Sequence, residues 1–278
     1  IARMPSITNS IADITRLNPQ ISVSTSGAMS FAGSNNRYNS FMVDGAANND
    51  VFGLTSNGSN GGQAGAQPLS METVEQIQVS VAPFDVRQSG FTGGAINAIT
   101  KSGTNEFHGS VYGDWLNQSL IGSKYKRIDG TTSQAYEDEK EYRYGLTVGG
   151  PIIKNKLFFF ANYEKSNKEY PNNYGLGSEL SKIDEAEAKK VIDKINELAA
   201  AQGVEYNTAI VNPKNYTKSD KAGLKLDWNI NDMHKASFRW SLVSAKQLNS
   251  NSSASSLRAS NNQYDFVSKT NTFIGELQ

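Results

Sequence analysis

The spacing of apolar side chains along the chain changes near residue 105. After this point apolar and polar residues alternate one by one, which is the spacing of β-strands with two different faces. Between residues 142 and 148, for example, Tyr, Leu and Val alternate with Arg, Gly and Thr. The pattern predicts six strands, over residues 107–116, 142–148, 157–164, 222–230, 236–242 and about 264–275.

The segments between these strands differ in length in a regular way. Two are short, 149–156 and 231–234, and three are long and polar, 117–140, 168–218 and 247–263. Short turns at one end of a sheet and long loops at the other are typical of outer-membrane β-barrels. A soluble β-sandwich has no reason to place every long loop at one end. Residues 181–202 have a helical pattern, which predicts a surface helix packed on the loops or, alternatively, a helix that binds a membrane or a partner.

The first part of the chain has a mixed pattern and is rich in Gly, Asn and Ser. It predicts a short helix over residues 6–14, with Ser6 or Thr8 available as N-cap. Segment 46–67 has almost no apolar pattern and predicts a long exposed loop. The Gly93–Gly94 pair is best explained by tight backbone packing against a neighbouring wall. Three strands are predicted here, over residues 39–44, 74–81 and 95–100.

Composition narrows the class of protein. The 27 basic and 27 acidic residues balance, so no strong global field favours nucleic acid. A mean hydropathy of −0.50 normally indicates a soluble protein, but a transmembrane β-barrel exposes only every second side chain to lipid. The 12 Tyr, 12 Phe and 3 Trp suit aromatic girdles and equally an aromatic-rich soluble β-protein. No apolar run approaches the ~20 residues of a membrane helix.

The sequence offers no catalytic or metal-binding constellation. It lacks Cys, which excludes disulfides and thiolate metal sites. Its His residues are His108 and His234, and neither has a nucleophile at the spacing of a known catalytic motif. The stretch from Asp44 to Asp50 lacks the spaced acids and the closing Glu of a calcium loop. No P-loop Lys-Ser/Thr follows Gly93–Gly94. We therefore expect no enzyme activity, no cofactor and no metal.

Three blocks resemble the plug signatures of TonB-dependent outer-membrane receptors. They are NSFMVDG at 39–45, VEQIQV at 74–79 and GGAINAITK at 93–101. The longer sequence segments 81–94 and 149–160 resemble those of the Oar-like subgroup, which is common in Bacteroidetes. The likeness covers most of residues 1–165 and, more loosely, 216–242. Each block alone is weak, but together they are quite specific.

The resemblance implies a fold and a location. The fold is an α+β plug over residues 1–104, truncated at its N-terminus, followed over 105–278 by the first six or so antiparallel transmembrane strands of a β-barrel. Such a plugged barrel has about 22 strands and lies in the outer membrane of a Gram-negative bacterium. An open six-stranded sheet would leave unpaired edges in lipid. Both ends of the chain also look cut, so we expect it to be part of a longer protein.

In this family the plug loops that face outside help to bind substrate. The matching candidate residues, whose amides, charges and one aromatic face suit that role, are Asn35, Asn36, Arg37, Asn48, Asn49, Asp50 and Phe52. The alternative is that these residues only close turns of the plug. Many family members also carry an Arg-Gly-Pro whose Arg contacts barrel carboxylates, but here residues 81–83 are Val-Ala-Pro. Arg87 is the substitute that we consider for this plug–barrel contact.

The function implied is import of a small molecule, glycan or peptide past a movable plug. Energy would come from a TonB complex that pulls on a TonB box, which this chain does not contain. Outer-membrane lipid and a lipoprotein are further expected partners. Two alternatives stay open: a structural or adhesive outer-membrane barrel without active transport, and a soluble secreted β-rich binding module. A hydrolase is a distant third, because no acid–base pair or nucleophile is evident.

Overall fold

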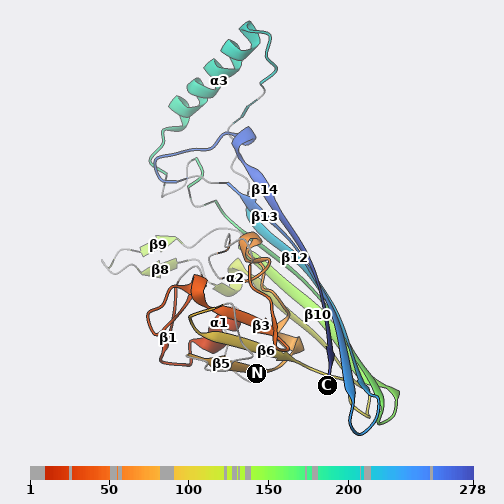
Figure 1. Ribbon diagram of the computed structural model, residues 1–278. Helices are drawn as coiled ribbons and strands as arrows, with labels where there is room; N and C mark the ends of the chain where they lie inside the picture. Colours follow the sequence, from red (N-terminus) through yellow and green to blue (C-terminus); the bar gives the residue numbers. More distant parts are fainter. Residues whose placement is uncertain are drawn as a thin grey trace.

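The chain forms an N-terminal unit, residues 10–104, that lies against one face of a long antiparallel sheet (Figure 1). This arrangement comes from a computed structural model. It describes residues 10–24, 27–50, 55, 58–81, 91–121, 124–126, 130, 132–134, 139–172, 174–176, 181–206, 208–209, 214–250 and 253–278.

The long sheet has six strands in the order β14-β13-β12-β11-β10-β7. Their bounds are β7 (His108–Asn117), β10 (Lys140–Ile153), β11 (Leu157–Tyr170), β12 (Asn215–Asn229), β13 (Lys235–Asn249) and β14 (Tyr264–Leu277). All six predicted strands are present, but several extend further toward the long loops than predicted. β12, for instance, begins at Asn215 and not at residue 222. Main-chain pairing continues there although the side chains are no longer apolar.

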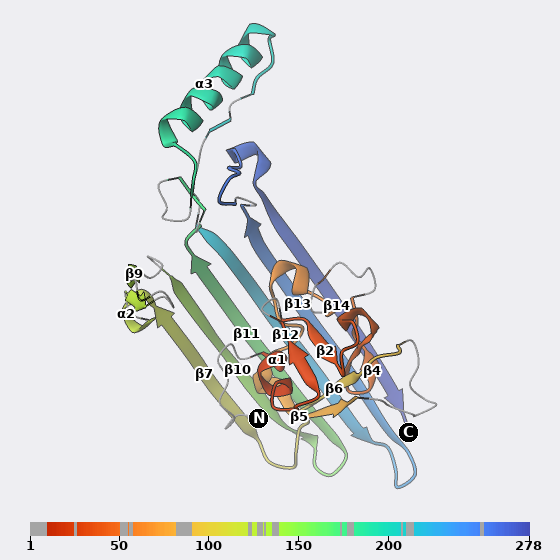
Figure 2. The ribbon, with the colours of Figure 1, turned by 90° about the vertical axis from the view of Figure 1, so that its left-hand side faces the viewer.

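The two faces of this sheet differ as the alternation predicts. Val111 is 89% exposed, and Trp115, Tyr144 and Leu146 are also exposed on the face turned away from the N-terminal unit. Thr147, which alternates with these residues, is buried on the other face. Short turns join the strands at one end of the sheet and long connections join them at the other (Figure 2). This is the strand and loop layout of a transmembrane β-barrel wall.

The long connections carry small elements. These are α2 (Gln118–Ile121), β8 (Lys124–Lys126), β9 (Thr132–Gln134), α3 (Glu185–Ala201) and the 3-10 helix η4 (Ser260–Asn262). Among the described residues, no helix has the length and apolar character needed to cross a membrane.

Helix α3 confirms the predicted helix but not its predicted packing. It begins after Asp184, whose side chain accepts a hydrogen bond from the Glu187 amide. None of its residues is buried, and Val191 and Leu198 of its apolar stripe are more than half exposed. The helix projects away from the sheet (Figure 1). Its described contact with the loops is polar, since the Asn196 side chain exchanges two hydrogen bonds with the Thr208 main chain at 2.8 and 3.1 Å, while the apolar side chains named above stay exposed.

The N-terminal unit contains one four-stranded sheet in the order β4-β3-β6-β5 and a two-stranded sheet of β1 and β2. Strands β3 and β6 run parallel, and β5 and β6 run antiparallel. The three predicted strands are confirmed as β3, β5 and β6. The bounds are α1 (Ile11–Thr15), β1 (Ile21–Val23), β2 (Met29–Phe31), η1 (Asn36–Tyr38), β3 (Ser40–Val43), β4 (Ala46–Ala47), η2 (Gly62–Ala64), η3 (Met71–Thr73), β5 (Val74–Ser80) and β6 (Ala95–Thr100).

Three local predictions for this unit need correction. Helix α1 is capped by Ser10 in a capping box with Asp13; Ser6 and Thr8 lie outside the described residues. Gly94 packs within the unit and not against a wall, since a Cβ there would lie 2.1 Å from Cδ1 of Phe31. The described part of loop 46–67 is not simply exposed, because it forms β4 and η2 and buries Ala64 completely.

Candidate functional site

The N-terminal unit touches the sheet through a buried charge pair. Glu164 on β11 and Lys221 on β12 are Cα partners, and the Lys221 Nζ donates to Glu164 Oε1 at 2.8 Å. Their side chains are 2% and 8% exposed. The Ser70 hydroxyl, from the N-terminal unit, donates to Glu164 Oε2 at 2.6 Å, and Tyr112 of β7 donates to the same oxygen at 2.8 Å. Every polar atom of the Glu164 carboxylate is thus satisfied, as a buried charge requires.

In a second contact the N-terminal unit supplies the carboxylate and the sheet supplies the cations. Asp44, at the turn between β3 and β4, lies 3.7 Å from the Lys225 Nζ and 3.5 Å from Nη1 of Arg239. Its carboxylate also accepts the amide and the hydroxyl of Thr100, at 2.7 and 2.6 Å. Asp44 has a φ of +49°, and Gly45 follows at +81°. An Asp tolerates this left-handed conformation better than most residues, so the turn holds the carboxylate toward the two wall cations.

Lys225 also bonds directly to the main chain of the N-terminal unit. Its Nζ donates to the Thr100 carbonyl at 3.3 Å. Lys225 and Arg239 are themselves Cα partners on β12 and β13. Two cations placed opposite each other are unfavourable alone, and Asp44 supplies the negative charge between them.

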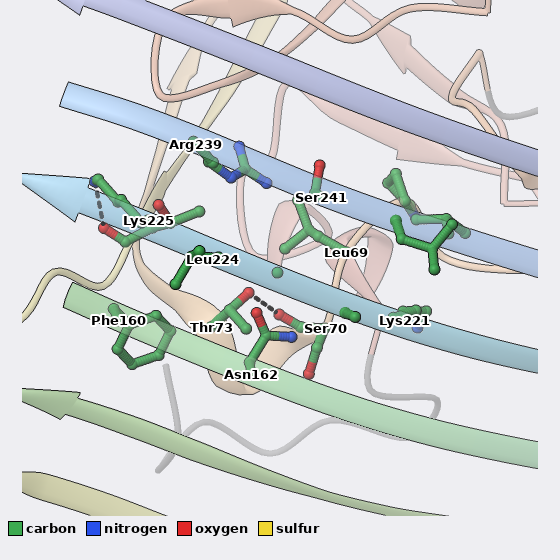
Figure 3. A pocket seen from close by; sticks show the side chains of 16 residues that line it. Leu69, Ser70, Thr73, Phe160, Asn162, Lys221, Leu224, Lys225, Arg239 and Ser241 are labelled. Atoms are coloured by element: carbon green, nitrogen blue, oxygen red, sulfur yellow. Dashed lines mark hydrogen bonds between the residues drawn. The ribbon is translucent and has the colours of Figure 1, made fainter.

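The space between these two contacts is small. It is a cavity of about 30 Å³ lined by residues that include Ser70, Thr73, Phe160, Lys225 and Arg239. Figure 3 shows side chains of both the unit and the sheet around it, with the Thr73 hydroxyl bonded to the Ser70 carbonyl. Such a volume holds about one or two water molecules. The unit and the sheet are therefore closely packed here.

The chain leaves the unit through a tight crossing. A Cβ on Gly103 would lie 2.3 Å from the Phe159 carbonyl oxygen and 2.8 Å from that of Gly150. Asn105 then exchanges two hydrogen bonds with Asn155 in the β10–β11 turn, at 2.7 and 2.8 Å. The polar segment 101–105 is thus anchored to the sheet.

At the long-loop end the contact is apolar and small. Ala64 and Ala66 of the unit form one buried cluster with Val243 and Ala245 of β13. Gly65, between the two alanines, lies close to the Thr217 side chain. Within the described residues, the unit thus meets the sheet at Ser70, at Asp44, at residues 103–105 and at Ala64–Ala66.

Six of the predicted substrate-binding residues are described, and they lie near the Ser40 end of β3, away from Asp44. The side-chain oxygens of Asn35 and Asn49 accept the amides of Arg37 and Phe41, at 3.0 and 2.6 Å. Asn48 accepts the Asn60 side chain at 2.8 Å, and Asp50 accepts the Thr55 amide at 2.7 Å. Gly58 lies against the Asn36 carbonyl, so the two predicted loops are adjacent.

Most of these polar groups thus take part in hydrogen bonds that close turns, as the alternative interpretation expects. Their role in binding substrate stays a prediction. Phe52 and Arg87 lie outside the described residues. Among the described residues, no group of three or more His, Asp or Glu side chains could hold a metal ion.

The residues that join unit and sheet were not predicted from the sequence. The prediction was an arginine of the N-terminal unit, Arg87, whereas in the described contacts the sheet supplies the cations and Asp44 supplies the carboxylate. The available signal was the presence of Glu164 and Lys225 at polar-face positions of predicted strands, with Lys221 directly before one of them. Their pairing depends on strand register, which the alternation does not give.

Comparison with known proteins agrees with this architecture. Residues 99–178 match the family model of an outer membrane beta barrel domain. The TonB-dependent transporter Oar of Myxococcus xanthus is 35% identical over 153 residues, which cover 54% of this chain and 14% of Oar. A probable TonB-dependent siderophore receptor, PirA of Acinetobacter baumannii, is 30% identical over 179 residues, which cover 58% of this chain and 21% of that protein. The chain thus spans about a fifth or less of the length of these relatives.

A solved structure shows the same fold. The outer membrane transporter YddB from Escherichia coli superposes with a TM-score of 0.66 at 15% identity, over 99% of this chain and 35% of YddB. The Oar likeness is confirmed by sequence, although this Oar comes from Myxococcus. Over part of its length the chain is thus similar to TonB-dependent transporters, and it forms part of an antiparallel β-barrel of the Gram-negative outer membrane.

Proposed function

We propose that residues 1–104 are the movable plug of an active transporter and that 105–278 are the first strands of its wall. The N-terminal unit supports this proposal because it has its own core. Ten buried apolar residues, all between Ile11 and Ala98, form that core without any residue of the sheet. A body with an independent core can leave the wall without unfolding.

The observation that carries the proposal is the nature of the unit–sheet contact. Ser70 and Asp44 meet the wall through hydrogen bonds and ion pairs, and the apolar contact involves mainly alanines and Val243. Water can replace polar partners when surfaces separate, so each such contact contributes only about 1 kcal/mol net or a few times that. This is the balance expected of a plug that stays closed at rest and opens under force.

The transporter would bind its substrate at the outer face and import it past the plug, using energy from a TonB complex and with no catalysis of its own. Candidate substrate contacts are the loops at Asn35–Arg37 and Asn48–Asp50. One relative is described as a probable siderophore receptor, so ferric siderophores are the first class to test. Small molecules of other kinds, glycans and peptides follow. A lipoprotein partner and membership of a Bacteroidetes subgroup are part of the same proposal.

The test is uptake by cells that express the full-length protein, with and without functional TonB. The probes are radiolabelled ferric siderophores of the catecholate and hydroxamate types, cobalamin, and fluorescent oligosaccharides and peptides. We expect one class to accumulate only when both the transporter and TonB are present. An outer-membrane protein that imports none of them, or imports one equally without TonB, would instead be a structural or adhesive barrel.

A further inference from the structure

Two cations of the wall depend on the N-terminal unit for their polar partners. The Lys225 and Arg239 side chains are 13% and 11% exposed, and the two residues are Cα partners on adjacent strands (Figure 3). Among the described residues, their side chains contact the Asp44 carboxylate, which they share, and the Thr100 carbonyl, which accepts from Lys225. Both partners belong to the unit, so movement of the unit removes them together.

The carboxylates at the same interface do not have this dependence. Glu164 keeps two partners on the wall, Tyr112 and Lys221, each at 2.8 Å. Asp44 keeps the amide and the hydroxyl of Thr100, which belong to its own unit, at 2.7 and 2.6 Å. Separation therefore leaves both carboxylates hydrogen-bonded, whereas two like charges stay opposite each other in the wall, where they repel. The vacated position favours an anion.

The contacts of Asp44 show what kind of anion fits. One of its oxygens lies 3.7 Å from the Lys225 Nζ and the other lies 3.5 Å from Nη1 of Arg239. The acceptor thus bridges the two cations with two oxygens, as a carboxylate or a phosphate does. Both distances exceed the ~2.8 Å of a good charge-assisted hydrogen bond, because Thr100 holds Asp44 on the side of the unit. A free oxyanion has no such tether and can approach both cations more closely.

The two cations also line open space. Besides the small cavity described above, they line a second cavity of about 450 Å³ toward the short turns. The ionisable residues around this larger cavity, among those that the structure describes, are Asp44, Lys225, Asp227, Lys235, Arg239 and Glu276. Three cations face three carboxylates while Asp44 is present, and three cations face two carboxylates once it leaves. Movement of the unit thus changes the net charge around this cavity from 0 to +1.

We infer that Lys225 and Arg239 form an oxyanion site in the wall, occupied at rest by Asp44 and, after the unit moves, by a carboxylate or phosphate group of the passing substrate. Exchange of Asp44 for a free oxyanion needs only the site itself, but passage of a substrate rests on the proposed function. The two carboxylates that remain nearby keep the site weak, and a site on a path must release its ligand as readily as it binds it. The inference favours substrates with negatively charged oxygen groups.

The first test replaces the Asp44 side chain by a free carboxylate. Full-length Asp44→Gly protein is purified in detergent; glycine suits the φ of +49° at this position. Its unfolding midpoint is measured in ~100 mM sodium acetate, in sodium chloride of equal ionic strength, and in that chloride with acetamide, the neutral analogue of acetate. Acetate should raise the midpoint by about 1–2 °C over both references, and inorganic phosphate should do the same. Wild type should show no such difference, because Asp44 already fills the site.

Variants of the cations show whether acetate acts at the proposed site. In the Asp44→Gly background, Lys225→Gln/Arg239→Gln should abolish the acetate effect. Lys225→Arg/Arg239→Lys keeps both charges and should retain it, so the prediction stays testable if the glutamine pair fails to fold. Equal midpoints of Asp44→Gly in acetate and acetamide would overturn the inference, and so would an acetate effect that persists in the glutamine pair. The first result would indicate that Asp227, whose Oδ2 has no hydrogen-bond partner among the described residues, neutralises the cations instead.

The uptake assay described above checks the passage of substrate. The class imported in a TonB-dependent way should carry negatively charged oxygen groups, as ferric catecholate siderophores do. TonB-dependent import restricted to uncharged oligosaccharides would overturn the inference while confirming transport. Import that does not need TonB would contradict the transport proposal and leave the acetate result unaffected. The two failures are therefore distinguishable.

Discussion

Removal of the Ser70 hydroxyl should loosen the N-terminal unit from the wall by a measurable amount. The hydroxyl donates to the Glu164 carboxylate at 2.6 Å, and a hydrogen bond to a charged group contributes about 1.5–3 kcal/mol. Glu164 keeps Lys221 and Tyr112 as partners, each at 2.8 Å. We therefore expect the lower end of that range for Ser70→Ala, which is about a tenfold increase in opening of the unit.

Variants of the charge pair should behave differently from the serine variant. Lys221→Met leaves the 2%-exposed Glu164 side chain without its cation, at a cost of about 3–5 kcal/mol. The double variant Glu164→Gln/Lys221→Met removes both charges and should be close to wild type in stability. The Glu164–Lys221 pair would thus add little net stability, but removal of one of its two members would be strongly destabilising.

Hydrogen exchange of the full-length protein, read by mass spectrometry, measures these openings segment by segment. Ser70→Ala should speed exchange in β6 of the unit and leave β11 of the wall unchanged. Ser22→Ala, at an exposed position of β1, is the matched control. Equal exchange in the Ser70 and Ser22 variants would refute the reasoning, as would a Glu164→Gln/Lys221→Met variant less stable than Lys221→Met alone.

Three further changes test other parts of the structure. Asp44→Asn removes the carboxylate charge that faces two largely buried wall cations. Calorimetry should show that the free energy of unfolding falls by about 1–3 kcal/mol. An unchanged melting temperature would contradict this contact. Gly103→Ala places a Cβ 2.3 Å from a main-chain oxygen and should lower the free energy of unfolding by about 1–3 kcal/mol. The variant should therefore unfold at a lower temperature in a gel-shift assay of heated samples. Gly275→Ala, whose Cβ would have no atom within 4 Å, should behave as wild type does. Val111→Lys, in the apolar band of the outward face, should cost about 2–4 kcal/mol in guanidinium unfolding. Val267 lies in the same row as Lys218 and Lys246 near the long-loop end, so Val267→Lys should cost about 0–1 kcal/mol. Equal costs would refute the membrane depths assigned to the two residues.

The wall strands were predictable from sequence because lipid imposes an apolar residue at every second position. Tyr144 and Leu146 alternate with smaller or polar residues for that reason. The prediction stopped where this constraint ends: near Lys218 the outward face becomes polar, although β12 continues to Asn215. The extra length of the strands was therefore not visible in the pattern.

The contacts between the unit and the wall were less predictable. Glu164 and Lys221 are 57 residues apart in the chain, and only the strand register brings them together. The Gly93–Gly94 pair predicts a close approach of the backbone to a neighbour, but the sequence does not say which neighbour. In the structure Phe31 of the same unit lies against Gly94. Local pattern thus predicts elements and faces, while the identity of partners depends on tertiary packing.

The most direct test of a movable plug is the accessibility of a cysteine placed at Ala66. This residue is 3% exposed between the N-terminal unit and β13, and the chain has no Cys of its own. In cells that express the full-length Ala66→Cys protein and are supplied with the substrate panel, a membrane-impermeant maleimide should label this thiol only when TonB is functional. Lys190→Cys, exposed on α3, should be labelled in both strains. Equal labelling of Ala66→Cys with and without TonB would contradict the account.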